Sequence, residues 1–197
     1  MRKPINDHAL DQIFRDARSY NVWSDEEVSD ETLTQLYDLL KWGPTSANCF
    51  PMRLVFLKSQ KAKARIKPHL IEGNVNKVMT SPVTVIIASD MKFYDRIPEL
   101  FPHNPGARDW FAHDEKVAFD TAFRNGTLQG AYLMIAARAL GLDCGPMSGF
   151  DNDGVDKEFF PDGQFKSNFL CALGVGTNEL LFGRSPRPAF DTVAEIL

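Results

Sequence analysis

The segment from Glu115 to Leu140 constrains the fold most strongly, because it predicts one long helix with an apolar second half. Residues 131–137 read Ala-Tyr-Leu-Met-Ile-Ala-Ala, which is apolar on nearly every side of a helix. A helix of that kind is buried in a core or covered by another subunit. Gly141 is a suitable residue for its end. The chain must therefore supply other elements that cover this helix.

Three short apolar runs predict buried strands that would pack with the long helix. They are residues 54–57, 83–88 and 169–175, and the second run is rich in β-branched residues. Ser29 is expected to cap a further helix that stops at Gly43, and another short helix follows Asp151. Strands separated by helical segments indicate an α/β or α+β layer protein.

Length and charge narrow the class of protein further. The 197 residues suit a single domain spanning 1–197, and the 22 basic and 26 acidic side chains give a net charge of −4. This balance argues against a general nucleic-acid binder. No stretch reaches the ~18–20 apolar residues that a membrane span requires. Three scattered cysteines form neither a disulfide pattern nor a zinc pattern, so the expected location is the reducing cytoplasm.

The segment 93–113 stands out as irregular. It holds Pro98, Pro102, Pro105 and Gly106, and several aromatic residues lie among them. Long irregular segments inside a compact domain are uncommon and often functional. Two readings stay open here: a lid over a substrate, or plain packing over the core.

The usual signatures of a protein nucleophile or a metal site are absent from the sequence. There is no Gly-x-Ser-x-Gly, no His-Glu-x-x-His and no Walker loop, and the four histidines lack ligand spacing. No metal is therefore expected. The stretch Gly174-Val175-Gly176 begins like a dinucleotide fingerprint but lacks the third glycine, so it is interpreted as a strand and a turn.

Several loops could bind an anion or a polar ligand, although each also has an ordinary structural explanation. An Arg-Ser pair follows the first helical segment, and a loop of small polar residues follows Gly43. Asn74 and Lys77 precede a buried strand, and two arginines lie near the C-terminus. Spacing alone leaves open whether these loops share one site.

Taken in order, these segments resemble the nitroreductase family of FMN-dependent oxidoreductases. The resemblance rests on Arg18-Ser19, Trp42–Asn48 with Pro51, Asn74 and Lys77, Gly141–Phe150 and the C-terminal basic stretch, and it covers nearly the whole chain. Two stretches, Lys41–Asn48 and Gly145–Phe150, look closest to the branch of malonic semialdehyde reductase-like proteins. The resemblance implies an α+β fold with a central mixed or antiparallel sheet flanked by helices. It also implies an intertwined homodimer with FMN at the subunit interface.

The same resemblance implies roles for individual residues. Arg18 and Ser19, completed by Arg184 or Arg187, would hold the phosphate, and Asn21 stands where the family usually has a basic residue. A loop from the partner subunit would approach the flavin, Asn74 and Lys77 would lie beside its pyrimidine ring, and the segment 146–149 would pass against the ring system. The implied cofactor-binding residues are Arg18, Ser19, Asn21, Pro44, Thr45, Ser46, Asn48, Asn74, Lys77, Pro146, Met147, Ser148, Gly149, Arg184 and Arg187.

The implied activity is a transfer of hydride from NADH or NADPH to an oxidised acceptor in two half-reactions. No protein side chain would carry the hydride, and Lys77 would support the flavin. The expected acceptor is a small aldehyde, with malonic semialdehyde reduced to 3-hydroxypropionate. The alternatives are a broad nitroaromatic, quinone or enone reductase, a non-catalytic FMN-binding protein, and a plain dimerising interaction domain. Phe50-Pro51-Met52 and Ser148 depart from other branches, which leaves acceptor and nucleotide preference open.

Overall fold

A four-stranded antiparallel sheet lies at the centre of the computed structural model, which describes residues 3–197. Its strands are β1 (Met52–Leu57), β2 (Val83–Asp90), β3 (Asp143–Met147) and β4 (Phe165–Gly174). They lie in the order β1-β2-β4-β3, and every neighbouring pair is antiparallel. Residues 1 and 2 of the expected domain lie outside the described residues.

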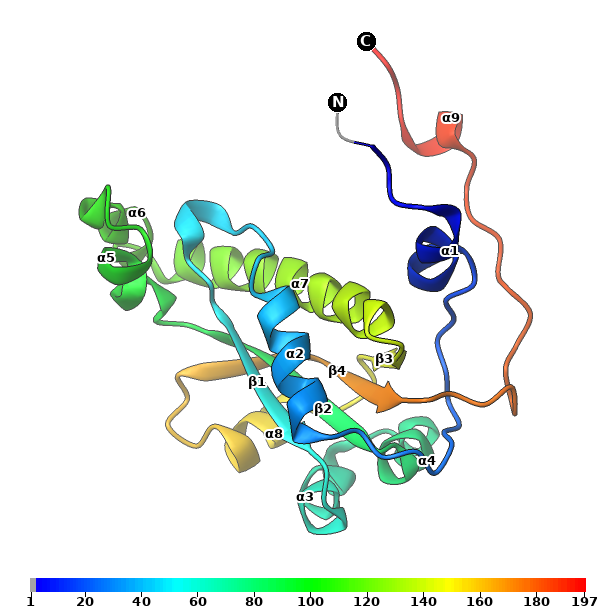
Figure 1. Cartoon of the computed structure of the whole chain (residues 1–197). Helices are drawn as coiled ribbons and strands as arrows, with labels where there is room; N and C mark the ends of the chain where they lie inside the picture. The colour runs from blue at the N-terminus through cyan, green and yellow to red at the C-terminus, as the bar shows by residue number, and fades with distance from the viewer. Residues whose placement is uncertain (1–2) are drawn as a thin grey trace.

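Helices cover both faces of this sheet, so the fold is α+β as expected (Figure 1). One face carries α2 (Asp30–Leu40) and α7 (Glu115–Ala139), and the other carries α3 (Gln60–Ile66), α4 (Glu72–Thr80) and α8 (Asn152–Phe159). The remaining short α-helices are α1 (Asp7–Leu10), α5 (Ile97–Leu100), α6 (Asp109–Ala112) and α9 (Phe190–Val193). Within residues 3–197, no helix combines the length and the apolarity that crossing a membrane requires.

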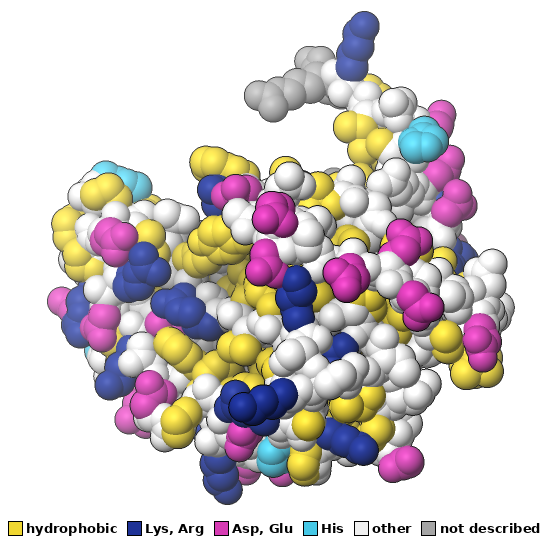
Figure 2. Space-filling model, turned by 60° about the horizontal axis from the view of Figure 1, so that its bottom comes forward, with side chains coloured by type: hydrophobic (Ala, Val, Ile, Leu, Met, Phe, Trp, Pro, Cys, Tyr) yellow, Lys and Arg dark blue, Asp and Glu magenta, His cyan; other side chains and the backbone are white. Residues whose placement is uncertain are grey.

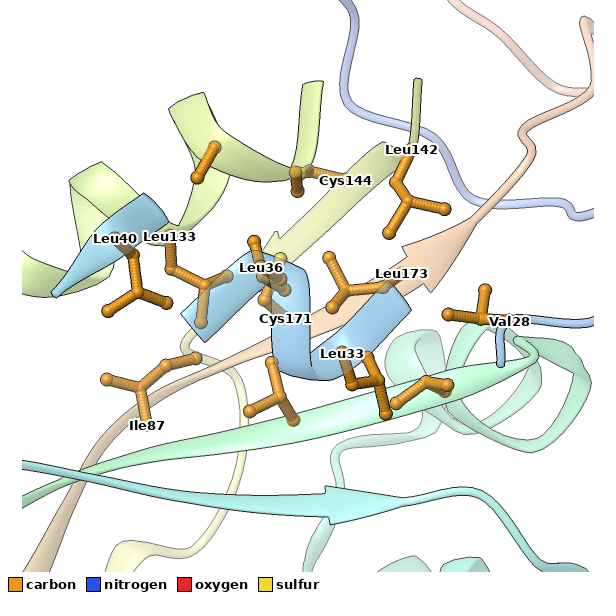
Figure 3. Packing of buried hydrophobic residues seen from close by; sticks show 14 of the residues in the cluster. Val28, Leu33, Leu36, Leu40, Ile87, Leu133, Leu142, Cys144, Cys171 and Leu173 are labelled. Atoms are coloured by element: carbon orange, nitrogen blue, oxygen red, sulfur yellow. The ribbon is translucent and has the colours of Figure 1, made fainter. Parts of the chain in front are cut away.

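Strand β2 shows why the sheet occupies the centre. Val85 and Ile87 pack in the cluster under α2 and α7, whereas Ile86 and Ala88 pack in the cluster with α3, α4 and α8. Figure 3 shows the first cluster, where leucines of α2 and α7 meet side chains of the sheet. A strand covered on both faces has no reason to alternate polar and apolar residues. This explains the continuous apolar run at 83–88.

The main helix and strand predictions are confirmed with small changes at the ends. The Oγ atom of Ser29 accepts a hydrogen bond from the Thr32 amide at 3.1 Å and so caps α2. Helix α7 ends at Ala139, and Gly141 follows in the left-handed region with φ of 81°. Strand β1 begins at Met52, two residues before the run that predicted it, and β2 continues through Ser89 and Asp90. Strand β4 begins four residues before its run, at Phe165, and ends at Gly174.

Two sequence interpretations are wrong. Residues 146–149 were interpreted as a connection between the long helix and the next element, but Pro146 and Met147 belong to the edge strand β3 (Asp143–Met147). An edge strand tolerates a proline, since only one of its sides is paired. The segment 93–113 is a chain of short helical turns rather than an irregular loop. Pro98 and Pro105 lie in the first turns of two of them, where proline favours helix initiation.

Candidate functional site

Four arginines from distant parts of the chain line one pocket of about 420 Å³, here called the arginine pocket. Arg18 follows the first helices, Arg138 lies in the last turn of α7, and Arg184 and Arg187 belong to the C-terminal segment. Ser19 also lines it, and no Asp or Glu does among the residues that the structure describes. Guanidinium groups without a neighbouring carboxylate favour an anion that accepts several hydrogen bonds, such as a phosphate.

The walls of the arginine pocket are tied together by hydrogen bonds between the two ends of the chain. Arg18 donates to the carbonyl oxygen of Phe182, and Arg184 donates to the carbonyl oxygens of Arg15 and Ala17 at 2.5 and 3.0 Å. The backbone of Ser19 forms an isolated parallel β-bridge with Cys144 of β3. Arg184 and Arg187, between which the sequence did not choose, both line the pocket.

Arg138 was missed by the sequence analysis. Its Nε atom is buried and has no hydrogen-bond partner within the described part of the chain, while its NH1 group donates to the carbonyl oxygen of Ile13 at 3.3 Å. An unpaired buried donor costs free energy, and the positive charge of the Arg138 guanidinium group, which lines the pocket, favours an anion there. The sequence feature that could have indicated Arg138 is its position as a single charged residue directly after the apolar run 131–137. The pocket residues therefore fit a phosphate group.

A second group of predicted residues meets where β3 leads into the following loop. Asn74 of α4 donates from Nδ2 to the carbonyl oxygen of Gly149 at 2.9 Å. A Cβ atom added at Gly149 would lie 2.3 Å from Cδ1 of Ile71 and 2.8 Å from Nδ2 of Asn74. The close approach of this loop to α4 therefore requires glycine.

Lys77 lies one turn after Asn74 on the same helix. Its Cδ atom would lie 3.2 Å from a Cβ added at Gly145, which brings its stem against β3. Burial lowers the pKa of its ammonium group. A partly desolvated cation of this kind interacts more strongly with a nearby negative charge than an exposed one does.

Pro146, Met147 and Ser148 line a mostly apolar pocket of about 350 Å³, here called the β3 pocket, together with residues of α7 and Phe169 of β4. Strand β3 connects it to the arginine pocket: Cys144 pairs with Ser19, and Met147 lies three residues further on, about 10 Å at the usual rise of a strand. The two pockets together suit an elongated ligand with an anionic group at one end and an apolar body at the other.

The loop after α2, residues 44–48, contacts α7 and the segment after β2. The Ser46 amide donates to Oδ1 of the buried Asn125 on α7 at 2.9 Å, and Nδ2 of Asn48 donates to the carbonyl oxygen of Leu100 at 2.7 Å. Pro44, Thr45, Ser46 and Asn48 line neither the arginine pocket nor the β3 pocket, and Asn21 is also outside both. One copy of the chain therefore does not bring every predicted residue to the same place.

The chain belongs to the nitroreductase family. The family model described as "Nitroreductase family" matches residues 14–177. This range contains β3 and β4 as well as helices α4 and α7, all of which contribute residues to the site. The match covers Arg18, the loop after α2, Lys77 and β3, but not Arg184 or Arg187.

Individual relatives agree with this family. A protein of Cupriavidus pinatubonensis, provisionally named NADH dehydrogenase/NAD(P)H nitroreductase, is 53% identical over 189 residues, which cover 95% of this chain and 96% of that protein. The protein HadB of Ralstonia pickettii, with the same provisional name, is 54% identical over 185 residues, covering 93% and 94%. The crystal structure of an Exiguobacterium sibiricum nitroreductase in complex with FMN matches with a TM-score of 0.85 at 21% identity, covering 100% of both chains.

Proposed function

We propose that this nitroreductase-family protein is an FMN-dependent NAD(P)H oxidoreductase. The observation that carries the proposal is the arginine pocket, which contains no carboxylate among the described residues and is joined by β3 to an apolar pocket. FMN has a phosphate at one end and a flat ring system at the other, which matches this arrangement. The relatives named as NAD(P)H nitroreductases support the choice of reductant.

The proposed contacts follow the two pockets. Arg18, Ser19, Arg184 and Arg187 would hold the phosphate, with Arg138 as an additional donor and Asn21 as a residue suggested by family resemblance alone. Pro146, Met147 and Ser148 would lie along the ring system, where Gly149 permits close approach of the backbone. Asn74 and Lys77 would face its polar edge.

When bound, FMN supplies the redox chemistry, accepting a hydride from NAD(P)H and passing it to an oxidised acceptor. The residues of the chain position the reactants and stabilise charge. The ammonium group of Lys77 holds a positive charge beside β3, where it stabilises negative charge that develops on the polar edge of a bound ring. Pro146 and Met147 exclude water from one side of the β3 pocket.

Replacing Lys77 by methionine is expected to slow reduction by NADH about 100-fold, the usual loss when one charge-stabilising donor is removed. Methionine keeps the apolar stem that packs near Gly145, so the fold should persist. Stopped-flow absorbance of the FMN-loaded protein measures the rate, and Lys61→Met on the exposed side of α3 is the control. A reduction rate equal to that of the unsubstituted protein would show that Lys77 does not stabilise charge on the bound flavin.

We also propose that the protein works as a homodimer. The loop containing Pro44, Thr45, Ser46 and Asn48 lies outside both pockets and is bonded to Asn125 and Leu100, and in this proposal it approaches a bound flavin from a second copy. Helix α7 leaves the side chains of Val117, Phe119, Phe123, Leu128 and Tyr132 exposed, and clustered exposed apolar side chains favour a protein–protein interface. The two ends of the described chain extend away from the sheet (Figure 1), and Figure 2 shows apolar side chains gathered in patches between charged ones on one face of the molecule.

Replacing apolar residues of the C-terminal segment by charged ones is expected to weaken the dimer. Phe190 and Ile196 are largely exposed in one chain, and Ile196 keeps 86% of its surface in contact with water. Burial of two such side chains against a partner is worth about 3–6 kcal/mol. The double variant Phe190→Asp, Ile196→Asp should therefore raise the dimer dissociation constant at least 100-fold in size-exclusion chromatography with light scattering. The neighbouring double variant Asp191→Ala, Glu195→Ala should remain dimeric, and equal dimer stability in both variants would contradict the proposal.

The proposed acceptor is a small aldehyde, with malonic semialdehyde converted to 3-hydroxypropionate in the cytoplasm. A second candidate is a broad reductase of nitroaromatic compounds, quinones or enones, which the mostly apolar β3 pocket favours. Steady-state kinetics with each acceptor, using NADH and NADPH in turn, separate these functions. Parallel double-reciprocal lines are expected for either function, and a kcat/KM highest for the aldehyde supports the first. An FMN-loaded protein that turns over no acceptor would leave only flavin binding.

A further inference from the structure

The loop 44–50, between α2 and β1, holds three residues other than glycine in the left-handed region of backbone conformation. They are Ala47, Asn48 and Phe50, with φ of 48°, 48° and 42°. Residues with side chains adopt this region rarely, and the alanine and the phenylalanine lack the polar group that helps asparagine to do so. A backbone of this kind persists where the surrounding structure holds it, and such backbone occurs often at functional sites. The contacts that hold the loop are therefore of interest.

Two buried carboxamide side chains of α7 supply such contacts, one near each end of the loop. Oδ1 of Asn125 accepts a hydrogen bond from the Ser46 amide at 2.9 Å, and Oε1 of Gln129 accepts one from the Met52 amide at 3.0 Å. Asn125 is 1% exposed and Gln129 is 0% exposed. They lie four residues apart, and so on one face of the helix. In Figure 1 the loop passes beside α7 on its way from α2 to β1.

The loop contact explains why a carboxamide occupies each of these buried positions. Nδ2 of Asn125 donates to the carbonyl oxygen of Thr121 at 2.8 Å, which turns its oxygen toward the loop. Nε2 of Gln129 is buried and has no hydrogen-bond partner within residues 3–197. An unpaired buried amide costs free energy that an apolar side chain would avoid. The bond to Met52 is the feature that compensates for this cost.

This arrangement fixes the backbone of the loop and leaves side chains of the loop at the surface. Pro44, Ser46 and Asn48 are exposed, whereas Cys49 at the end of the loop is buried. The three exposed residues belong to the group that the proposed function assigns to a flavin bound with a second copy. The α7 contacts thus lie behind the loop, on the side away from any ligand that approaches it from outside.

We propose that Asn125 and Gln129 are positioning residues, which hold the loop 44–50 in the conformation that meets a flavin bound in the arginine pocket of a second copy. Both side chains are buried, so each acts through a backbone amide of the loop. This inference rests on the proposed function, which supplies the flavin and the second copy.

Hydrogen exchange of the full chain without FMN, measured by mass spectrometry, tests the contact with the loop. Asn125→Leu and Gln129→Met each remove one acceptor, and exchange within residues 44–52 is expected to rise about 10-fold, the effect of one lost hydrogen bond. Exchange in β2 should keep the rate of the parent, because the change is local. Unchanged exchange in the loop, or an equal rise in β2, would overturn the proposal.

The affinity for FMN tests the consequence for the site. The dissociation constant, measured by quenching of flavin fluorescence, is expected to rise about 10-fold in Asn125→Leu and in Gln129→Met. Asn125→Asp should restore both slow loop exchange and parental affinity, because burial favours the neutral carboxyl group, which accepts from the loop and donates to the Thr121 carbonyl oxygen. Parental affinity in a variant with faster loop exchange would overturn the proposal.

The matched control is Thr121→Val. It removes a hydroxyl group from a buried position of α7, one turn before Asn125, and leaves the backbone carbonyl oxygen in place. Loop exchange and the affinity for FMN should both equal those of the parent. Effects as large as those of Asn125→Leu would show that any loss of a polar group from this face of α7 is sufficient, which contradicts the assignment.

A mixed dimer separates positioning from a general structural role. It pairs a chain that carries Arg18→Ala with a chain that carries Asn125→Leu, purified through two different tags. If each loop serves the pocket of the other copy, one of the two sites combines an intact pocket with an intact loop. Titration with FMN should then give one site of parental affinity per dimer. Two weakened sites would overturn the proposal, because defects confined to their own chains do not complement each other.

Binding of FMN by the parent distinguishes failure of this inference from failure of the proposed function. If the parent retains no FMN, the proposed function fails before any variant is compared, and this inference fails with it. If the parent binds FMN and is reduced by NADH while the Asn125 and Gln129 variants match it in loop exchange or in affinity, this inference fails alone.

Discussion

Replacing Arg18 by alanine is expected to weaken FMN binding about 10- to 100-fold. A hydrogen bond between a guanidinium group and a phosphate contributes roughly 1.5–3 kcal/mol, and the other arginines of the pocket remain. The affinity of Arg18→Lys for FMN should lie between that of the parent and that of Arg18→Ala, because lysine keeps the charge but loses the planar pair of donors. Quenching of flavin fluorescence during titration of the flavin-free protein measures the dissociation constant.

Two further variants test whether the loss of FMN affinity is specific to the arginine pocket. Arg65→Ala removes an arginine from an exposed ion pair with Glu158, 2.6 Å long and outside the arginine pocket, and should leave the affinity for FMN unchanged. Arg138→Leu should also weaken binding, because it removes a second positive charge from the arginine pocket. Because Arg18 also contacts Phe182, thermal melting must show that the variant stays folded. Unchanged affinity in a folded Arg18→Ala protein would remove the phosphate assignment.

Gly149→Ala is expected to lose most of its bound FMN and about 1–3 kcal/mol of unfolding free energy. The added methyl group would lie 2.3 Å from Cδ1 of Ile71 and 2.8 Å from Nδ2 of Asn74, so the loop must move away from α4. That movement breaks the hydrogen bond between Asn74 and the Gly149 carbonyl oxygen. Urea unfolding and the ratio of flavin to protein absorbance measure the two effects.

Gly73→Ala is the matched control, since it adds the same methyl group one residue before Asn74. No atom lies within 4 Å of its added Cβ, and alanine is favoured over glycine inside α4 by about 0.5–1 kcal/mol. This variant should be slightly more stable than the parent and retain its FMN. A Gly149→Ala protein that behaves like Gly73→Ala would contradict the tight approach of the loop to α4.

Periodicity and capping were sufficient to predict the elements with a clear apolar pattern. The spacing of Leu33, Leu36 and Leu40, with Ser29 before them, predicts α2 because those residues share one buried face. The run 83–88 predicts β2 because both faces of that strand are covered. These features are local in the sequence, so tertiary structure is not needed to recognise them.

Strand β3 could not be predicted in the same way. Gly145 and Pro146 favour turns in isolation, and the strand exists because β4 pairs with it through residues that follow more than 20 positions later. Gly145 is also needed for packing, as a Cβ there would lie 2.6 Å from the Tyr20 carbonyl oxygen. Long-range pairing of this kind leaves little trace in a local pattern.

The candidate site was predicted in part. The ordered motifs indicated Arg18, Ser19 and the C-terminal arginines, and the structure brings these residues together. The sequence analysis missed Arg138, because a single arginine at the end of an apolar helix is indistinguishable from a surface charge. Whether the loop around Ser46 reaches the same flavin depends on a second copy of the chain, which no single-chain pattern specifies.

The visible absorption spectrum of the purified protein tests the central claim most directly. The protein is mixed with FMN, freed of unbound flavin by desalting, and measured without oxygen before and after NADH is added. The proposed function predicts about one flavin per chain, with visible bands that disappear on addition of NADH and return when an acceptor follows. A colourless protein that retains no added FMN would contradict it.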